Sequence, residues 1–449
     1  MTLAAAASGS ARARAGTCAR AWDVGVGVPG ANSPINALFV RNEGDVPVLY
    51  AGGRFTQIDG VAAGKIARWN GLQWSALGSG ISGVGAAVHA MAEYDDGDGP
   101  VLFVGGEFSG AGGTPSARLA RWDGSGWRSV GSGTNGTVFA LAVFDNGDGE
   151  ALYVGGAFSE AGGVGATHIA RWDGTAWSPV GAGFDGNVHA LAAFDDGDGP
   201  ALYAGGEFTA SGATGLFHIA RWNGSAWTPL AGGLNGPVYA FAEFNDGGGS
   251  RLYAGGSFRS ATADDGTANV AEAAISSIVS WDGVSFGSVG GGTDAVTRAL
   301  AVFDDGTGAA LYAGGTFQLA GGSPASRIAR WSGNAWSTLG VGANNAVFAL
   351  AAAGGSSPIG PGLFAAGSFT LAGNQTSTYV ARWVDCGDVP GDVNGDGAID
   401  LVDFVRIPLC LEGPQRIVQP ACLKVDLDFD ADVDLRDVQT FENLFTGTE

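Results

Sequence analysis

Hydrophobic residues recur along the chain in short runs of Val, Leu, Phe, Tyr and Trp that are separated by Gly, Asn and Asp. The clearest example is residues 188–232, VHALAAFDDGDGPALYAGGEFTASGATGLFHIARWNGSAWTPLAG. Apolar runs bounded by turn residues predict β-strands. Four such runs fall within this stretch, and edited copies of it fill residues 35–383. The pattern therefore predicts a repeated unit of four short strands.

Three sequence elements mark seven copies of this unit. The first apolar run begins at Ile35, Val88, Val138, Val188, Val238, Thr297 and Val347. The LYAGG-type run begins at Leu49, Leu102, Leu152, Leu202, Leu252, Leu311 and Leu363. The IARW-type run ends at Trp69, Trp122, Trp172, Trp222, Trp281, Trp331 and Trp383. A second aromatic follows five residues later at Trp74, Trp127, Trp177, Trp227, Phe286 and Trp336.

Four strands in about fifty residues are typical of a β-propeller blade. The Asp-Asp-Gly-Asp-Gly stretch after the first run predicts a tight hairpin, because Gly and Asp tolerate positive φ. The Gly-Gly that ends the second run lets two backbones approach closely. We therefore expect an all-β, seven-bladed β-propeller with four-stranded blades over residues 21–385.

The repeat also resembles a known family. A strand that ends in Gly-Gly, followed by an aromatic about fifteen residues later and then by a Trp, resembles the Kelch repeat of the galactose oxidase central domain. The resemblance covers residues 35–383, with Trp where Kelch repeats usually have Tyr. It implies that the first strand of each blade lines a central channel and that the fourth is outermost. Repeats of this pattern also resemble propellers of large bacterial secreted proteins and of a fungal cortical marker family.

The seventh unit stops at ARWVDC and has no aromatic five residues beyond Trp383. Residues 21–27, AWDVGVG, are similar to residues 176–182, AWSPVGA. We predict that this N-terminal segment supplies the missing fourth strand, which would remove two exposed strand edges. Cys18 and Cys386 would then lie in one hairpin, and we expect a disulfide between them. Two free thiols are the alternative.

After Asp385 the composition becomes rich in aspartate, and two stretches have EF-hand calcium spacing. The expected oxygen ligands of the first loop are Asp392, Asn394, Asp396, Asp400 and Asp403, with the carbonyl of Ala398. Those of the second loop are Asp426, Asp428, Asp430, Asp434 and Asp437, with the carbonyl of Asp432. So many carboxylates would repel one another without a cation. We expect two Ca²⁺ ions, although Ala431 replaces the usual glycine of the second loop. An acidic turn without metal is the alternative.

Each acidic loop leads into a predicted helix, over residues 401–407 and 435–444. Two such halves resemble a type I dockerin domain, which implies a small α-helical calcium domain over residues 386–449 and a cohesin-like protein partner. The loop positions that commonly contact cohesin carry Leu401–Val402 and Leu435–Arg436 instead of the common Ser-Thr pair, which speaks against a cellulosomal partner. We expect Cys410 and Cys422, between the halves, to pair.

Charge and the N-terminus bear on partners and location. The formal net charge of −22 argues against a nucleic-acid partner, which requires Lys and Arg. No apolar run is long enough to span a membrane. Residues 1–20 form an arm with small residues and three arginines, which we interpret as the remnant of a secretion signal. We expect the protein outside the cell or at the cell surface.

Residues that break the repeat are the candidates for chemistry. His89 and His189 share one repeat position with Asn36, Phe139, Tyr239, Arg298 and Phe348. His168 and His218 share another with Lys65, Arg118, Ser277, Arg327 and Tyr379. Histidines spread in this way indicate packing or rim residues, and a metal site is the alternative. The recurring IARW arginine is expected to be structural, paired with an acid or stacked on tryptophan. The acidic hairpins are expected to act as turns, with weak calcium binding as the alternative.

The sequence has no nucleophile elbow, phosphate-binding loop or zinc spacing. The galactose oxidase copper site requires a Tyr–Cys crosslink, and no cysteine lies inside the intact repeats. Connections after the second and fourth strands vary, with an insertion within residues 260–274. We therefore expect a non-enzymatic binding protein whose variable-loop face recognises a glycan or protein. The alternative is an extracellular carbohydrate-active enzyme, which a carboxylate pair at the channel mouth would indicate.

Overall fold

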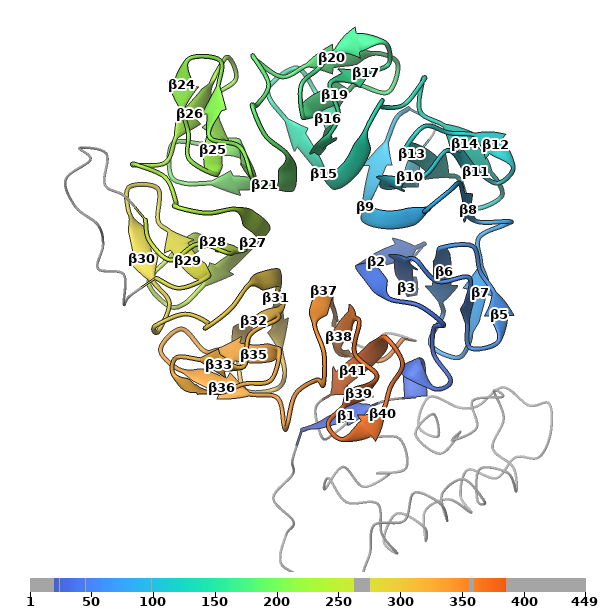
Figure 1. Cartoon of the computed structure of the whole chain (residues 1–449), viewed down its shortest axis with the longest axis vertical. Helices are drawn as coiled ribbons and strands as arrows, with labels where there is room; N and C mark the ends of the chain where they lie inside the picture. The colour runs from blue at the N-terminus through green and yellow to red at the C-terminus, as the bar shows by residue number, and fades with distance from the viewer. Residues whose placement is uncertain are drawn as a thin grey trace, which may run out of the picture. The chain divides into compact units, whose positions relative to one another are not determined.

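The computed structural model describes residues 20–384 except 24, 45, 98, 262–274 and 355–358. The chain divides into two compact units, one of which is Ala21–Val384. Within the described residues this unit contains seven four-stranded antiparallel sheets, arranged as blades around a centre (Figure 1). The predicted all-β propeller is confirmed. The four cysteines, both predicted calcium loops and residues 262–274 of the blade-five insertion lie outside the described residues.

The inner and second strands of each blade are the longest. The inner strands are β2 (Ile35–Glu43), β9 (Ala87–Asp95), β15 (Thr137–Asp145), β21 (Val188–Asp195), β27 (Val238–Asn245), β31 (Thr297–Asp304) and β37 (Val347–Ala353). The second strands are β3 (Val46–Gly53), β10 (Pro100–Glu107), β16 (Glu150–Ala157), β22 (Pro200–Gly206), β28 (Ser250–Gly256), β32 (Ala309–Gly315) and β38 (Gly362–Gly367).

The third and outermost strands carry the paired aromatics. The third strands are β6 (Ile66–Trp69), β13 (Leu119–Trp122), β19 (Ile169–Trp172), β25 (Ile219–Trp222), β29 (Ile278–Trp281), β35 (Ile328–Trp331) and β41 (Val380–Val384). The outermost strands are β7 (Trp74–Ala76), β14 (Trp127–Ser129), β20 (Trp177–Pro179), β26 (Trp227–Pro229), β30 (Phe286–Ser288), β36 (Trp336–Thr338) and β1 (Ala21–Asp23).

Short strands occupy the connections around the blades, and a 3-10 helix, η1 (Gly25–Gly27), follows β1. These strands are β4 (Gln57–Ile58), β5 (Val61–Ala62), β8 (Ile81–Ser82), β11 (Gly110–Ala111), β12 (Thr114–Pro115), β17 (Glu160–Ala161), β18 (Val164–Gly165), β23 (Ala210–Ser211), β24 (Thr214–Gly215), β33 (Leu319–Ala320), β34 (Ser323–Pro324), β39 (Leu371–Ala372) and β40 (Gln375–Thr376). In the part of the chain that the structure describes, no helix is long and apolar enough to cross a bilayer.

The hydrophobic core lies between neighbouring blades. Phe103 of the second blade packs in one buried cluster with Leu152 and Trp172 of the third. Residues of the second strands are buried on both faces, because each blade is covered by a neighbour on either side. This burial explains why the LYAGG run is apolar at consecutive positions, whereas the inner strands alternate.

The N-terminal strand completes the last blade, as predicted. Strand β1 pairs antiparallel with β41, with Trp22 opposite Trp383 and Asp23 opposite Arg382. The Trp22 Nε1 donates a hydrogen bond to the Leu339 carbonyl over 3.0 Å. The same bond to the preceding blade is made by Trp74, Trp127, Trp177, Trp227 and Trp336. Strands β2 and β37 are in contact, so the first and last blades are neighbours.

The IARW arginines pair with acids, as one of the two predicted structural roles requires. In the fourth blade, the Nε of Arg221 lies 2.8 Å from the Asp196 carboxylate, which also accepts a hydrogen bond from the Tyr203 hydroxyl. Burial opposes ionisation of Asp196, but the bonds from Tyr203 and Arg221 hold its pKa below the usual value. Arg68–Glu43, Arg121–Asp96 and Arg330–Asp305 use the acid at the same repeat position. Arg171 instead lies 3.9 Å from Asp173, and Arg382 pairs with Asp23 of β1.

In blade five Ser280 replaces the IARW arginine, and an arginine at another position pairs with the acid. Arg251, on the neighbouring strand β28, lies 3.0 Å from Asp246, the equivalent of Asp196. We predict that Arg251→Ala will lower the free energy of unfolding by about 1–3 kcal/mol, because a largely buried carboxylate loses its cation. Ser280→Arg should restore much of this loss in the same chain. Chemical denaturation measures both effects.

The control for this prediction is Arg259→Ala, which removes an exposed arginine from the same blade. An Arg251→Ala loss no larger than that of the control would contradict the compensation between positions 251 and 280, as would a failure of Ser280→Arg to recover stability.

The acidic hairpins act as turns, as predicted. In the fourth blade the Asp195 Oδ1 accepts hydrogen bonds from the backbone nitrogens of Gly197, at 2.9 Å, and Gly199, at 3.1 Å. The same pair of bonds forms at Asp145. The carboxylate therefore satisfies backbone donors of its own turn.

Candidate functional site

Each inner strand carries a β-bulge near its start. In β15, Val138 pairs with Gly156 and Ala140 with Gly155, which leaves Phe139 unpaired. The same register shift occurs in the other six inner strands. We call the seven bulged residues the mouth ring: Asn36, His89, Phe139, His189, Tyr239, Arg298 and Phe348. A bulge re-aims its side chain, so one repeat position from every blade is turned toward the channel.

The Gly-Gly pair opposite the bulge makes this arrangement possible. A Cβ at Gly156 would overlap the Thr137 carbonyl oxygen, next to the bulge. A Cβ at Gly155 would meet the Val188 Cγ1 of the following blade at 2.5 Å. The predicted role of these glycines in close backbone approach is therefore confirmed, and it extends to the bulge itself.

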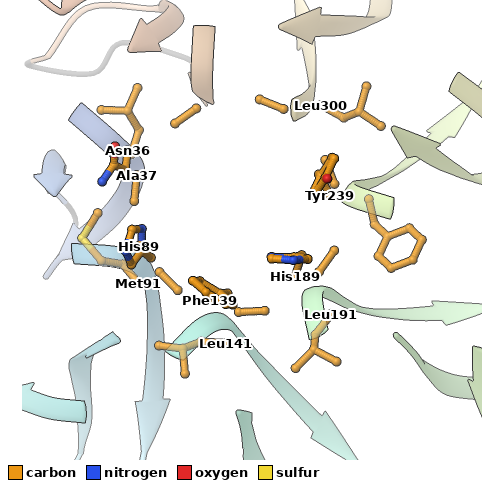
Figure 2. Close-up of a pocket in the computed structure, with 18 of the residues that line it drawn as sticks. Asn36, Ala37, His89, Met91, Phe139, Leu141, His189, Leu191, Tyr239 and Leu300 are labelled. Carbon is orange, nitrogen blue, oxygen red and sulfur yellow. The ribbon is translucent and has the colours of Figure 1, made fainter. Parts of the chain in front are cut away.

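The mouth ring and Arg54 line a cavity of about 370 Å³ at the start of the inner strands. His89, Phe139, His189 and Tyr239 line this cavity and also the adjoining hollow that Figure 2 shows. A second hollow of about 230 Å³ shares five mouth-ring residues and is otherwise lined by Ala, Leu, Met and Phe side chains of the inner strands. Arg54 directly follows β3 and therefore begins the connection from the second to the third strand. The cavity thus opens on the face that carries the variable connections.

Aromatic side chains of the mouth ring touch one another from blade to blade. The ring centroids of His89 and Phe139 are 5.6 Å apart, those of Phe139 and His189 4.8 Å, and those of His189 and Tyr239 5.2 Å. Edge-to-face and tilted contacts between these four rings fix their orientation. Four neighbouring blades thus present one continuous aromatic wall.

The mouth-ring residue after Tyr239 in blade order is the cation Arg298. The guanidinium carbon of Arg298 lies 5.3 Å from the centroid of Tyr239 and 5.9 Å from that of Phe348. Asn36 stands between Phe348 and His89 in blade order, and its Nδ2 donates to the Val88 carbonyl over 3.3 Å. The mouth ring therefore combines flat apolar faces, one stacked cation and one anchored carboxamide.

No carboxylate lines the cavity among the described residues, whereas two arginines do. Glu207, which follows β22 directly, has its Oε1 3.2 Å from the His189 Nε2. Asn187 donates a second hydrogen bond to Glu207 over 2.8 Å. Burial lowers the pKa of His189 despite this carboxylate, so its imidazole is neutral at pH 7.

His89 is also neutral at pH 7. Burial, together with the charges of Arg54 and His189, lowers its pKa from 6.5 to about 4. Since the unfolded chain binds the proton more tightly, the resulting stability is present above pH 6.5 and is lost as pH falls toward 4. We predict that the wild type loses about 1–2 kcal/mol more stability between pH 7 and pH 5 than His89→Phe.

Phenylalanine is the matched replacement, because it occupies this position in two other blades as Phe139 and Phe348. Unfolding in denaturant at pH 7 and pH 5 supplies the comparison. Equal losses in the two proteins would show that His89 titrates normally in the folded state.

The second histidine position has a backbone explanation. His168 and His218 have φ of 63° and 75°, and all seven residues at this repeat position have positive φ. The backbone nitrogen of His168 donates to the Phe158 carbonyl over 2.8 Å, and the side-chain Nδ1 of His168 lies 2.8 Å from the Phe184 carbonyl. This position therefore serves the connection between the second and third strands. Across the described residues, no group of three or more His, Cys, Asp or Glu side chains is placed to hold a metal ion.

One comparison with known protein families agrees with the propeller fold. Residues 128–304 match the family model for the Rax2 C-terminal β-propeller domain. The curated proteins contain no sequence that matches this chain.

Among solved structures, the extracellular domain of a B. thetaiotaomicron protein described as a one component system is 9% identical, with a TM-score of 0.48, over 84% of this chain and 42% of that one. An ancestral GH74 enzyme is 15% identical (TM-score 0.44), over 83% of this chain and 48% of that one. The Niastella koreensis GH74 enzyme is 13% identical (TM-score 0.41), over 81% and 55%. The chain spans about half the length of these proteins.

Proposed function

We propose that this is a non-enzymatic binding protein that acts outside the cell or at its surface, with the channel mouth of the propeller as its recognition site. The observation that carries the proposal is the mouth ring. Bulges in all seven blades turn one side chain each toward a single cavity, and these side chains differ between blades while the scaffold around them repeats. A rigid scaffold with variable residues at one opening is typical of a recognition site.

The composition of the cavity favours binding over hydrolysis. Glycoside hydrolysis usually requires two carboxyl groups that flank the scissile bond. Among the described residues the lining supplies aromatic, imidazole, carboxamide and guanidinium groups and no carboxyl group. The carbohydrate-active enzyme is therefore the weaker interpretation. A glycan or protein ligand fits the aromatic wall, because such side chains provide large contact areas with little loss of conformational entropy.

An array of glycans and proteins probed with the full chain tests this proposal. Signals should disappear in the double variant Tyr239→Ala/Phe348→Ala, which removes two faces of the mouth ring. They should persist in Val284→Ala, which removes an apolar side chain that is 83% exposed in the turn before β30. Hits that survive the double variant would place recognition elsewhere and refute the proposal.

We further propose that residues 386–449 form a dockerin-like attachment module that binds two Ca²⁺ ions and a cohesin-like partner. Support comes from the donor set of the two acidic loops, whose hard oxygen ligands suit calcium at the spacing of an EF-hand loop. Asp392, Asn394 and Asp396 would begin the first site, and Asp426, Asp428 and Asp430 the second. The bound ions would neutralise the carboxylates and thereby stabilise the module.

Calcium titration of the full chain by calorimetry measures this directly. We predict two binding events in the wild type, with loss of the first-loop event in Asp392→Ala and retention of the second-loop event. Asp426→Ala is the matched variant and should have the opposite effect. The absence of calcium binding to the wild type, or identical titrations for all three proteins, would contradict the module.

A further inference from the structure

We infer that the mouth ring recognises an acidic saccharide, a uronic acid in which one carboxylate accompanies several hydroxyl groups. The inference rests on the proposed recognition site and names its ligand class. It follows from three features of the cavity: the charge of its lining residues, the contacts of Arg298 with two aromatic rings, and the hydrogen-bonding character of the remaining polar groups.

The residues that line the cavity carry positive charge in a strongly acidic protein. The chain carries a formal net charge of −22, yet the cavity is lined by Arg54 and Arg298 and, among the described residues, by no Asp or Glu. Both arginines are exposed to solvent. The two arginines attract an anion to their part of the lining, whereas the Glu207 carboxylate, 3.2 Å from the His189 Nε2, repels one from the part around His189.

Arg298 is held in place for a planar anion. Its guanidinium lies over Tyr239 on one side and Phe348 on the other, at 5.3 Å and 5.9 Å from their ring centroids. Cation–π contact with two rings restricts the position of the guanidinium, and its fork matches the geometry of a carboxylate. No salt bridge between described residues involves Arg298.

The other polar groups suit hydroxyls better than a second charge. Hydroxyl groups both donate and accept hydrogen bonds, and so do a carboxamide and a neutral imidazole. Asn36 provides the first, while His89 and His189 provide the second, since burial keeps both imidazoles neutral at pH 7. The faces of Phe139 and Tyr239 offer apolar contact to the ring of a sugar. The cavity, at about 370 Å³, is at the small end of ligand pockets, as a mono- or disaccharide unit requires.

Binding of oligosaccharides of galacturonate, glucuronate and mannuronate to the full chain, measured by calorimetry, tests the inference. Each acidic oligosaccharide is paired with its methyl ester, which removes the charge and keeps the hydroxyls. We expect at least one acid to bind and its ester to bind about tenfold more weakly or worse. In Arg298→Gln the acid and the ester should bind alike. The control Arg327→Gln, an arginine of the same blade outside the cavity lining, should keep the wild-type preference.

An ester that binds as tightly as its acid, or a preference that survives Arg298→Gln, would overturn the acidic ligand while leaving the mouth as a recognition site. If no acidic oligosaccharide binds but an array ligand is lost in Tyr239→Ala/Phe348→Ala, the ligand class is wrong and the proposed function stands. If no acidic oligosaccharide binds and no array ligand is lost in Tyr239→Ala/Phe348→Ala, both the ligand class and the proposed function are wrong.

Discussion

Trp22→Ala is expected to lower the free energy of unfolding of the propeller by about 3–5 kcal/mol, the range for truncating a buried aromatic residue. Trp22 is 5% exposed, lies 5.4 Å from Trp383 between ring centroids and donates to the Leu339 carbonyl. Its loss would also weaken the pairing of β1 with β41, on which closure of the last blade depends. Chemical denaturation followed by tryptophan fluorescence measures the change.

Trp22→Phe separates packing from the hydrogen bond. Phenylalanine keeps an aromatic side chain but removes the donor to Leu339, so we expect a loss of about 1 kcal/mol. Blade five shows that the blade tolerates this residue, because Phe286 occupies the equivalent position opposite Trp281. If Trp22→Ala is no more costly than Trp22→Phe, β1 contributes little to the stability of the propeller and the account of closure is wrong.

Gly156→Ala is expected to cost about 3 kcal/mol or more, at the upper end for overpacking, because the added Cβ would overlap the backbone carbonyl of Thr137. The backbone must shift to accept this atom, and the shift would disturb the bulge that presents Phe139. We therefore expect reduced stability together with weaker binding at the mouth. Equilibrium unfolding gives the first effect and calorimetric titration the second.

Gly165→Ala is the matched control in the same blade. Gly165 is exposed at the end of β18, and a Cβ there would have no neighbour within 4 Å. This control should change stability by less than about 0.5 kcal/mol. Similar stabilities for Gly156→Ala and Gly165→Ala would show that the bulge does not depend on glycine.

The repeat predicted the propeller because each residue type in it has one local role. Trp at the end of the third strand, Gly-Gly at the end of the second and Asp-Gly in the hairpins mark the four strands without tertiary information. The role of residues 21–27 was also predictable, since the seventh unit lacks one aromatic and the N-terminus supplies it as Trp22. The pairing of β1 with β41 confirms this interpretation.

The candidate site was predicted less completely. The alignment of repeats placed His89 and Arg298 at one position, but the bulge that turns them into the cavity depends on cross-strand pairing, which a single sequence does not display. Arg54 was missed because it follows the Gly-Gly pair and looks like an ordinary loop residue. Its position next to a backbone constriction was the available signal. In blade five the sequence alone showed only that Ser280 replaces the arginine. That Arg251 pairs with Asp246 instead depends on which strands are adjacent, which the sequence does not display.

The most direct test of the central claim, that the channel mouth is the recognition site, is hydrogen–deuterium exchange of the full chain with and without the tightest-binding array ligand. The account predicts slower exchange in the segments that carry the mouth ring, above all residues 236–241 and 295–300. Exchange in the hairpins at the opposite ends of the inner strands, such as residues 146–149, should not change. Protection confined to those hairpins, or to the outermost strands, would contradict the account.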